Sequence, residues 1–249
     1  MTQVDRGLSS RYEHLYDRLL AAAGATPGVQ PQELAAFWPM VGRAYDGRLL
    51  VVGRAVNGWI DQVRVPELAD ADYRASTLAT LRRTSEGDGT TCPMSWVTWR
   101  WGRGGGEYST ARSAFWRLTR GVLRAVDPAS LDDPAWSSRL AWSNLAKLAP
   151  WGGGNPGGAL LDVERQVGPE LLMAEVNELK PDRVLVLTGR WWFEPFARHL
   201  TLTVDWRVGL VEGVAEDASR RWVIAPHPQG KRRALLGEVI GAFGAEPRP

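Results

Sequence analysis

The sequence predicts an α/β protein with a three-layer α/β/α architecture around a central, mostly parallel four-stranded sheet. Apolar runs typical of buried strands alternate along the chain with segments of helical periodicity, which is typical of parallel sheets covered by helices on both faces. Two of the strands end in turns rich in Gly, Asn, His or Pro, within 49–58 and 222–231. Because ligands bind where the strands of such sheets end, we expect one pocket built from both ends of the sequence.

The amino-terminal part of the chain is predicted to be helical before the first strand begins. A helix is expected over 10–23, where four apolar residues recur at helical spacing: Tyr12, Leu15, Tyr16 and Leu19. A second short helix is expected over 33–41. Gly47 then turns the chain into a buried strand over 48–52.

An irregular insertion is expected at about 62–108, because glycine-rich stretches interrupt it and only 70–83 has a helical pattern. A long helix follows over 110–126, with Ser109 or Thr110 as its expected cap.

The second half of the chain contains the remaining strands and helices of the predicted sheet. Strands are expected over three apolar runs: 140–145, 182–187 and 222–225. Helices are expected over three segments of helical periodicity: 160–179, 191–200 and 231–243. A minor strand is expected over 208–211. We therefore expect 1–249 to form a single domain.

Composition limits the class of protein and the chemistry of its site. Cys92 is the only cysteine, so no intrachain disulfide and no multi-cysteine metal site can form. No apolar run is long enough to cross a membrane, and the first residues lack the layout of a signal peptide. We therefore expect a monomeric, soluble, cytoplasmic protein. The net charge is only +2, and the 13 Trp residues are compatible with either core packing or base stacking.

Four motifs follow one another along the chain. GRAVNG at 53–58 follows the first strand, and SNLAK at 143–147 closes the second. LKPDRVLVLTG at 179–189 contains a proline just before the third strand, and PHPQ at 226–229 follows the fourth. In order and spacing these motifs resemble those of the uracil-DNA glycosylase superfamily, over roughly 48–243 without the insertion.

The chain departs from that superfamily at several positions. The most similar branch is the bacterial and archaeal one that carries an iron–sulfur cluster. That cluster needs four cysteines, so Cys92 alone excludes it, and we expect neither a cofactor nor a metal. Arg54 stands where that branch has an acidic residue, and Ala55 stands where other branches have Asp or Asn. Gln229 replaces the usual Ser after His-Pro.

The resemblance implies a nucleobase pocket with assigned catalytic roles. His227 would donate a hydrogen bond to the departing base, and Asn144 would read the base edge with its donor and acceptor groups. Asn57 would hold a water, and Asp61, the nearest acid downstream, would activate that water. Simpler interpretations stay open, because His227 can pack in a proline-rich turn and Asn57 belongs to an Asn-Gly turn.

Further contacts are expected around the same pocket. The predicted substrate-binding set is Gly53, Arg54, Ala55, Trp59, Asn144 and Pro228. Gly53 would let a ligand approach the backbone closely, and Trp59 would form either a pocket wall or part of the core. The guanidinium of Arg54 would oppose a cationic sugar, so it would instead contact a phosphate or turn away from the pocket.

A basic run begins the last predicted helix: Lys231, Arg232 and Arg233. It is expected either to bind DNA phosphate or to form a solvated helix end.

The resemblance implies recognition of a nucleobase in DNA, with excision of uracil or another damaged base by N-glycosidic hydrolysis. Such a hydrolase would take part in base-excision DNA repair, on single- or double-stranded DNA. Two alternatives stay open. One is a catalytically inactive nucleic-acid-binding member of the same fold, favoured by Arg54 and Ala55. The other is an enzyme acting on a free nucleoside or nucleotide.

Overall fold

The computed structural model describes 8–29, 32–56, 62–86, 91–101, 108–217, 219–230 and 233–244. The chain divides into two compact units, and each is described by itself. The first unit comprises Met1–Pro39, Arg54–Asp88 and Asn144–Lys180. The second comprises Met40–Gly53, Gly89–Ser143 and Pro181–Pro249.

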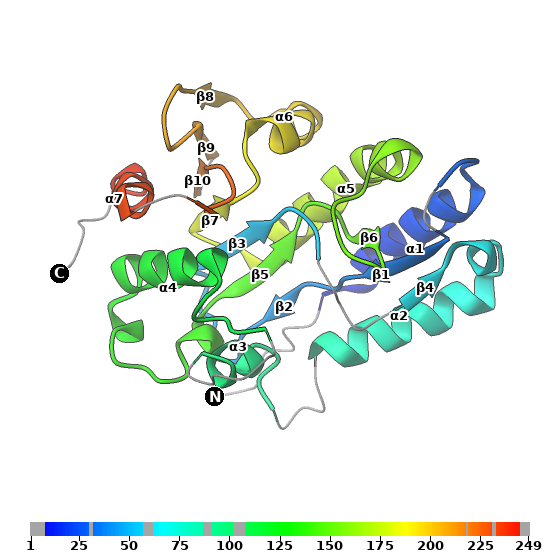
Figure 1. Ribbon diagram of the computed structural model, residues 1–249, viewed down its shortest axis with the longest axis horizontal. Coiled ribbons are helices and arrows are strands. Elements are labelled where there is room, and N and C mark those ends of the chain that lie inside the picture. The colour runs from blue at the N-terminus through cyan, green and yellow to red at the C-terminus, as the bar shows by residue number, and fades with distance from the viewer. Residues whose placement is uncertain are drawn as a thin grey trace. The chain divides into compact units, whose positions relative to one another are not determined.

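The first unit combines a small antiparallel sheet with long helices (Figure 1). The sheet has three strands in the order β4-β1-β6, with these bounds: β1 Glu33–Ala36, β4 Gln62–Arg64 and β6 Leu148–Pro150. The helical elements are α1 Ser10–Ala25, η1 Val65–Ala69, α2 Ala71–Glu86 and α5 Gly158–Leu179. Helix α1 packs against α5, η1 and α2, so it forms the centre of this unit.

Aromatic rings fill the core of the first unit. Tyr12 and Tyr16 of α1 are fully buried, and Trp38 is 1% exposed. The Tyr12 ring meets the Trp38 ring edge-on at 4.8 Å between centroids, and the Tyr16 ring stacks on Trp38 at 5.5 Å. Because Tyr12, Leu15, Tyr16 and Leu19 are all buried, the helical periodicity predicted over 10–23 identifies the correct face of α1.

The second unit is built on a mixed sheet of seven strands in the order β2-β5-β3-β7-β10-β9-β8. Their bounds are β2 Met40–Val41, β3 Leu49–Gly53, β5 Ala141–Asn144, β7 Arg183–Val186, β8 Val204–Trp206, β9 Gly213–Asp217 and β10 Arg220–Ile224. Strand β7 is parallel to both β3 and β10. The pairs β2–β5, β10–β9 and β9–β8 are antiparallel. Only the last residue of β5, Asn144, falls in the first unit.

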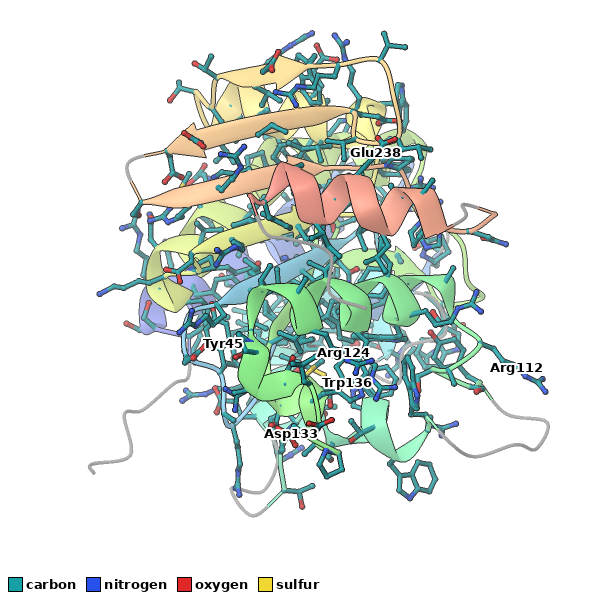
Figure 2. The ribbon with its side chains drawn as sticks, turned by 90° about the vertical axis from the view of Figure 1, so that its left-hand side faces the viewer. Tyr45, Arg112, Arg124, Asp133, Trp136 and Glu238 are labelled. Carbon is teal, nitrogen blue, oxygen red and sulfur yellow. The ribbon has the colours of Figure 1, made fainter. Side chains whose placement is uncertain are left out.

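Four α-helices and two short 3-10 turns accompany this sheet. They are α3 Ser95–Trp99, α4 Ala114–Val126, η2 Pro128–Ser130, η3 Trp136–Arg139, α6 Arg190–His199 and α7 Arg233–Ala242. Helices α4 and α7 pack against each other, and Figure 2 shows them side by side in front of the strands. No helix among the described residues has the length and apolar character that crossing a membrane requires.

The predicted α/β class is confirmed, and the predicted strands are present. The apolar runs at 48–52, 140–145, 182–187 and 222–225 form β3, β5, β7 and β10, which are neighbours in the order β5-β3-β7-β10. The expected number of strands is wrong, because β2, β8 and β9 extend the sheet to seven strands and make it mixed. These additional strands have two to five residues, too few for a clear alternating pattern.

The helix expected over 33–41 is wrong, because this segment forms β1 and β2. Strand β1 pairs with β4 on one side and β6 on the other, so its backbone groups are used by the sheet. Leu34, Ala35 and Ala36 are all fully buried, which a surface helix with one apolar face does not allow. Tertiary pairing therefore overrides the short helical pattern.

Two smaller predictions are also corrected. Helix α4 begins at Ala114, and its cap is Ser113, whose hydroxyl accepts from the amide of Trp116. Thr110, one of the expected caps, instead donates its hydroxyl to the carbonyl of Val97 at 2.7 Å. The strand expected over 208–211 lies in the connection between β8 and β9. The segment expected as an irregular insertion contains β4, η1, α2 and α3 among its described residues.

The packing at Gly42 gives a test of the second unit. A Cβ atom at Gly42 would lie 2.1 Å from the carbonyl oxygen of Ser138, so Gly42→Ala must displace backbone. We expect a loss of roughly 1–3 kcal/mol in the free energy of unfolding. A Cβ atom at Gly237, inside α7, would meet nothing within 4 Å. Gly237→Ala should therefore be neutral, or stabilise by up to about 1 kcal/mol. Equal effects of the two changes in urea denaturation would contradict this packing.

Candidate functional site

Three parallel strands of the second unit end at one edge of the sheet. Strands β3, β7 and β10 run in the same direction, so their carboxyl ends lie together. The ladder continues past the strands, because the Leu187 amide donates to the Val52 carbonyl at 2.8 Å and the Ala225 amide donates to Val186 at 2.9 Å. Gly53 closes β3 and His227 follows β10, so the predicted residues Gly53 and His227 belong to the same edge.

The order of the strands marks one position along this edge. Strand β5 follows β3 in sequence and lies on one side of it, whereas β7 and β10 lie on the other side. The direction in which strands are added therefore reverses at β3. In open α/β sheets, a crevice for ligands forms outside the carboxyl ends of the strands at such a reversal. This rule points to the ends of β3 and β7, beside the turn that carries His227.

The ring of His227 is held by its own turn. The backbone amide of Gln229 donates to His227 Nδ1 at 3.3 Å. A ring nitrogen that accepts a hydrogen bond carries no proton, so the neutral imidazole has its hydrogen on Nε2. The side chain is half-buried, and the following Pro228 is buried. In the neutral ring, Nε2 is therefore the donor atom.

A glycine and a carboxylate shape the neighbouring strand end. Gly189 has a φ of 84°, and its amide donates to the Ala225 carbonyl at 2.9 Å. A Cβ atom at Gly189 would lie 3.3 Å from Glu212 Oε2, so the position is restricted in space as well as in backbone conformation. Glu212 also accepts from the amide of Arg190 at 2.5 Å. The carboxylate of Glu212 therefore occupies the amino terminus of α6, where an anionic ligand would otherwise bind.

Three predicted residues belong to the first unit: Arg54, Ala55 and Asn144. The carbonyl of Arg54 accepts from the amide of Ala146 at 2.9 Å, which joins the first motif to the motif at 143–147. Arg54 is half-buried, and this burial lowers the pKa of its guanidinium. Asn144 is 1% exposed, so its side chain is part of the protein interior.

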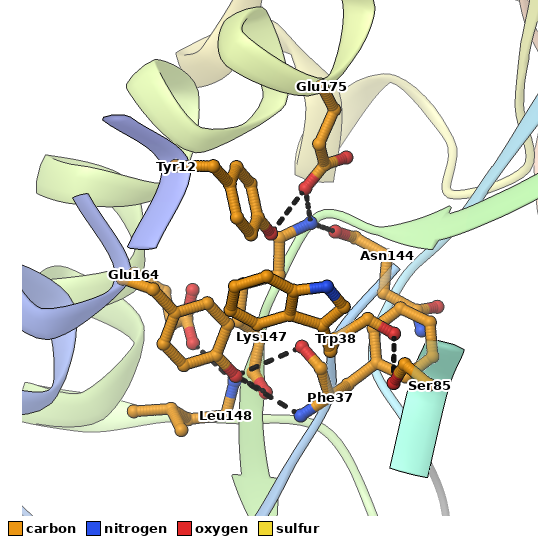
Figure 3. Close-up of polar contacts among 10 residues, drawn as sticks. Tyr12, Phe37, Trp38, Ser85, Asn144, Lys147, Leu148, Glu164 and Glu175 are labelled. Carbon is orange, nitrogen blue, oxygen red and sulfur yellow. Dashed lines mark hydrogen bonds and ion pairs between the residues drawn. The ribbon is translucent and has the colours of Figure 1, made fainter. Parts of the chain in front are cut away.

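Lys147 is fully buried and anchors the backbone at Asn144 (Figure 3). Its ammonium Nζ lies 2.6 Å from Glu175 Oε1 and donates to the Asn144 carbonyl at 2.5 Å. Glu175, also fully buried, accepts a second hydrogen bond from the hydroxyl of Tyr12 at 2.8 Å. Burial, together with the charge of Glu175, raises the pKa of Tyr12 well above its ordinary value. These contacts connect α1, α5 and the end of β5.

Lys147 belongs to the motif at 143–147, and the sequence pattern predicts no role for it. The available signal is a lysine inside an otherwise apolar run, Leu145 to Ala149, because a buried lysine needs a partner. That partner, Glu175, lies on a different helix and could not be identified from the pattern.

A second buried carboxyl lies beside this pair. Glu164 is 1% exposed, and its Oε1 accepts from the amide of Leu148 at 2.6 Å. Burial raises the pKa of Glu164 to about 7, although hydrogen bonds from the backbone of Leu148 and Lys147 and the charge of Lys147 oppose the shift. Glu164 is therefore a carboxyl that holds its proton up to neutral pH.

Several predicted residues lie outside the described part of the chain: Asn57, Trp59, Asp61, Lys231 and Arg232. Arg233 begins α7, but its side chain also lies outside the described set. Among the described side chains, no group of three His, Cys, Asp or Glu residues could hold a metal ion. The described residues thus divide the predicted set, with Gly53, His227 and Pro228 in the second unit.

Breaking the Lys147–Glu175 pair should destabilise the chain strongly. Lys147→Met leaves the carboxylate of Glu175 buried without its cation, and we expect a loss of roughly 3–5 kcal/mol in the free energy of unfolding. Arg18→Met breaks an exposed pair with Glu170 in the same unit and should cost less than about 1 kcal/mol. Urea denaturation measures both changes. A loss at Lys147 no larger than that at Arg18 would contradict the buried pair.

The raised pKa of Glu164 predicts a pH-dependent stability. Its pKa is about 7 in the folded chain against an ordinary 4.5, so the folded state keeps a proton that the unfolded state releases. The stability from this proton is complete below pH 4.5 and is lost as the pH rises toward 7. Relative to Glu164→Gln, the native chain should lose on the order of 2–3 kcal/mol between pH 5 and pH 8. A pH-independent difference between the two proteins would reject this behaviour.

Comparisons with known proteins assign neither a family nor a function to the chain. No model of a protein family matches the chain, and no curated protein matches it.

Proposed function

We propose that this chain is a uracil-DNA glycosylase-like protein that recognises a nucleobase in DNA. The reaction would be excision of uracil or another damaged base by hydrolysis of the N-glycosidic bond. The carboxyl edge of β3, β7 and β10 in the second unit would form the site. The proposal includes a monomeric protein acting in the cytoplasm without a cofactor.

The observation that carries the proposal is the shared edge of Gly53 and His227. These residues belong to the first and last motifs, which are far apart in the sequence, and parallel β3, β7 and β10 end beside both. Gly53 offers backbone without a side chain, and His227 offers a neutral Nε2 donor. Flipped bases are recognised in tight pockets of this chemistry.

The proposed chemistry places negative charge on the departing base. When the bond between the sugar C1′ and the base nitrogen breaks, the base keeps the electron pair and the sugar becomes cationic. A hydrogen bond from His227 Nε2 to a base oxygen would stabilise the developing negative charge. Water then adds to C1′, and its proton balances the charge of the base.

The proposal extends to the finer architecture. Strands β5, β3, β7 and β10 would correspond to the four-stranded sheet of a three-layer glycosylase-like fold. Strands β2, β8 and β9 would be additions at its two edges. Support comes from the contiguous order of the four strands and from the parallel pairing of β7 with β3 and β10.

A second candidate function is recognition of DNA without excision. Arg54 and Ala55 provide neither a carboxylate nor an amide where the first motif of active relatives has one. The guanidinium of Arg54 would also oppose positive charge on the sugar. A chain with these residues could keep a base-binding pocket while lacking the group that activates water.

An excision assay separates the candidates. Oligonucleotides with uracil, hypoxanthine or xanthine, single- and double-stranded, are incubated with the full chain. We expect cleavage at one of these bases. His227→Ala should slow it about 100-fold or more, because a donor to the developing charge is lost. His199→Ala, an exposed histidine of α6 in the same unit, should leave the rate unchanged.

The other outcomes identify the alternatives. Salt-sensitive binding without cleavage would support the binding protein and reject excision. If the chain neither binds nor cleaves the oligonucleotides, both DNA functions are rejected. Hydrolysis of free nucleosides or nucleotides would then support the small-molecule enzyme.

A further inference from the structure

Helix α4 carries a row of arginines. Arg117, Arg120 and Arg124 are separated by three and four positions, so they follow one side of the helix. Arg117 and Arg124 are exposed and Arg120 is half-buried; Figure 2 labels Arg124 on this helix. Helix α4 contains no acidic residue. None of the ion pairs formed by the described residues of this unit involves the three arginines.

Three interactions within the row oppose the formation of α4. Like charges three or four residues apart repel one another, at a cost of about 0.2–0.5 kcal/mol a pair. Arg117 lies in the first turn, where the helix dipole disfavours a cation. Burial, with the charge of Arg124 as a second cause, lowers the pKa of Arg120. Because α4 contains no acidic residue to neutralise the row, an anionic partner is the physical reason that fits it.

Two tryptophans hold the middle arginine of the row. The Arg120 guanidinium carbon lies 4.8 Å from the centroid of the Trp101 ring and 5.8 Å from that of Trp136. These rings meet edge-on at 5.3 Å, and Trp136 is only 1% exposed. Arg120 is therefore fixed in orientation before any partner binds, which reduces the entropy lost on binding.

Helix α4, which carries the row, packs against α7. A Cβ atom at Gly121 would come within 2.8 Å of Leu236, so the two helices approach closely at this glycine. Helix α7 begins at Arg233, within the run for which the sequence predicted phosphate contacts. The arginine row thus lies on a helix that packs against the helix beginning at Arg233.

We infer that Arg117, Arg120 and Arg124 form a contact surface for the sugar-phosphate backbone of a nucleic-acid strand. The inference rests on the proposed function and names a surface of the second unit through which DNA would be held. Guanidinium groups match phosphates with paired hydrogen bonds. From Arg117 to Arg124 the helix rises about 10 Å, close to the rise of three stacked nucleotides. A linear row on a helix fits a linear polyanion.

The test compares two double variants of the full chain. Arg117→Gln with Arg124→Gln removes the exposed ends of the row and leaves the Arg120 stacking in place. Arg198→Gln with Arg207→Gln is the control, because it removes the same charge from exposed arginines paired with Glu194 and Asp205. Fluorescence anisotropy with a labelled 20-nucleotide strand, repeated over a salt series, measures the affinity of each protein.

We expect the row variant to bind about 10-fold more weakly at low salt. Its slope of log affinity against log salt should fall by about 1.4–1.8, which corresponds to two lost phosphate contacts. The control should keep the native slope. Equal losses in both variants would overturn the inference, as would arginine-dependent binding to phosphatidylserine vesicles or an acidic peptide without binding to the oligonucleotide.

The same measurements separate this inference from the proposed function. If the native protein binds the strand but excises no base, the proposed excision is rejected and the inference about the arginine row remains supported. If the row variant excises and binds as the native protein does, the inference about the arginine row is rejected and the proposed function remains supported.

Discussion

The parallel pairing of β7 with β3 and β10 is the constraint on which the candidate site depends. Parallel neighbours must end at the same edge, so distant motifs meet there once the register is set. Val184, Leu185 and Val186 are consecutive and fully buried, so both faces of β7 are covered and the strand is held inside the sheet. The position of His227 and Gly53 at one edge of the sheet, with β7 between their strands, is therefore a product of hydrophobic burial.

The first unit uses a different means to order its polar residues. There the interior contains a buried cation and two buried carboxyls, and each of these groups has at least one hydrogen-bond or ion-pair partner. Such groups gain little net stability over an apolar core, yet they permit few alternative arrangements. Lys147 can reach both Glu175 and the carbonyl of Asn144 only when α5 and the end of β5 are in place. The network thus specifies the backbone that precedes Lys147.

Sequence patterns predicted the strongly periodic elements and failed where contacts between distant segments decide the structure. The strands β3, β5, β7 and β10 are apolar runs bounded by breakers, and each could be found from the residues alone. The segment 33–41 could not, because its strands exist through pairing with β4, β5 and β6. In the candidate site, Gly53 and His227 follow from a rule about strand ends. The role of Lys147 depends on Glu175, 28 positions away on another element, which no local pattern reveals.

The protonated carboxyl of Glu164 couples folding to the uptake of a proton from the solvent. Near neutral pH the unfolded chain has released this proton, whereas the folded chain retains a substantial fraction of it. Folding is therefore a reaction that consumes hydrogen ions from the buffer. The heat measured on unfolding will include the ionisation enthalpy of whichever buffer is chosen. A calorimetric enthalpy for this chain thus belongs to the protein and its buffer together.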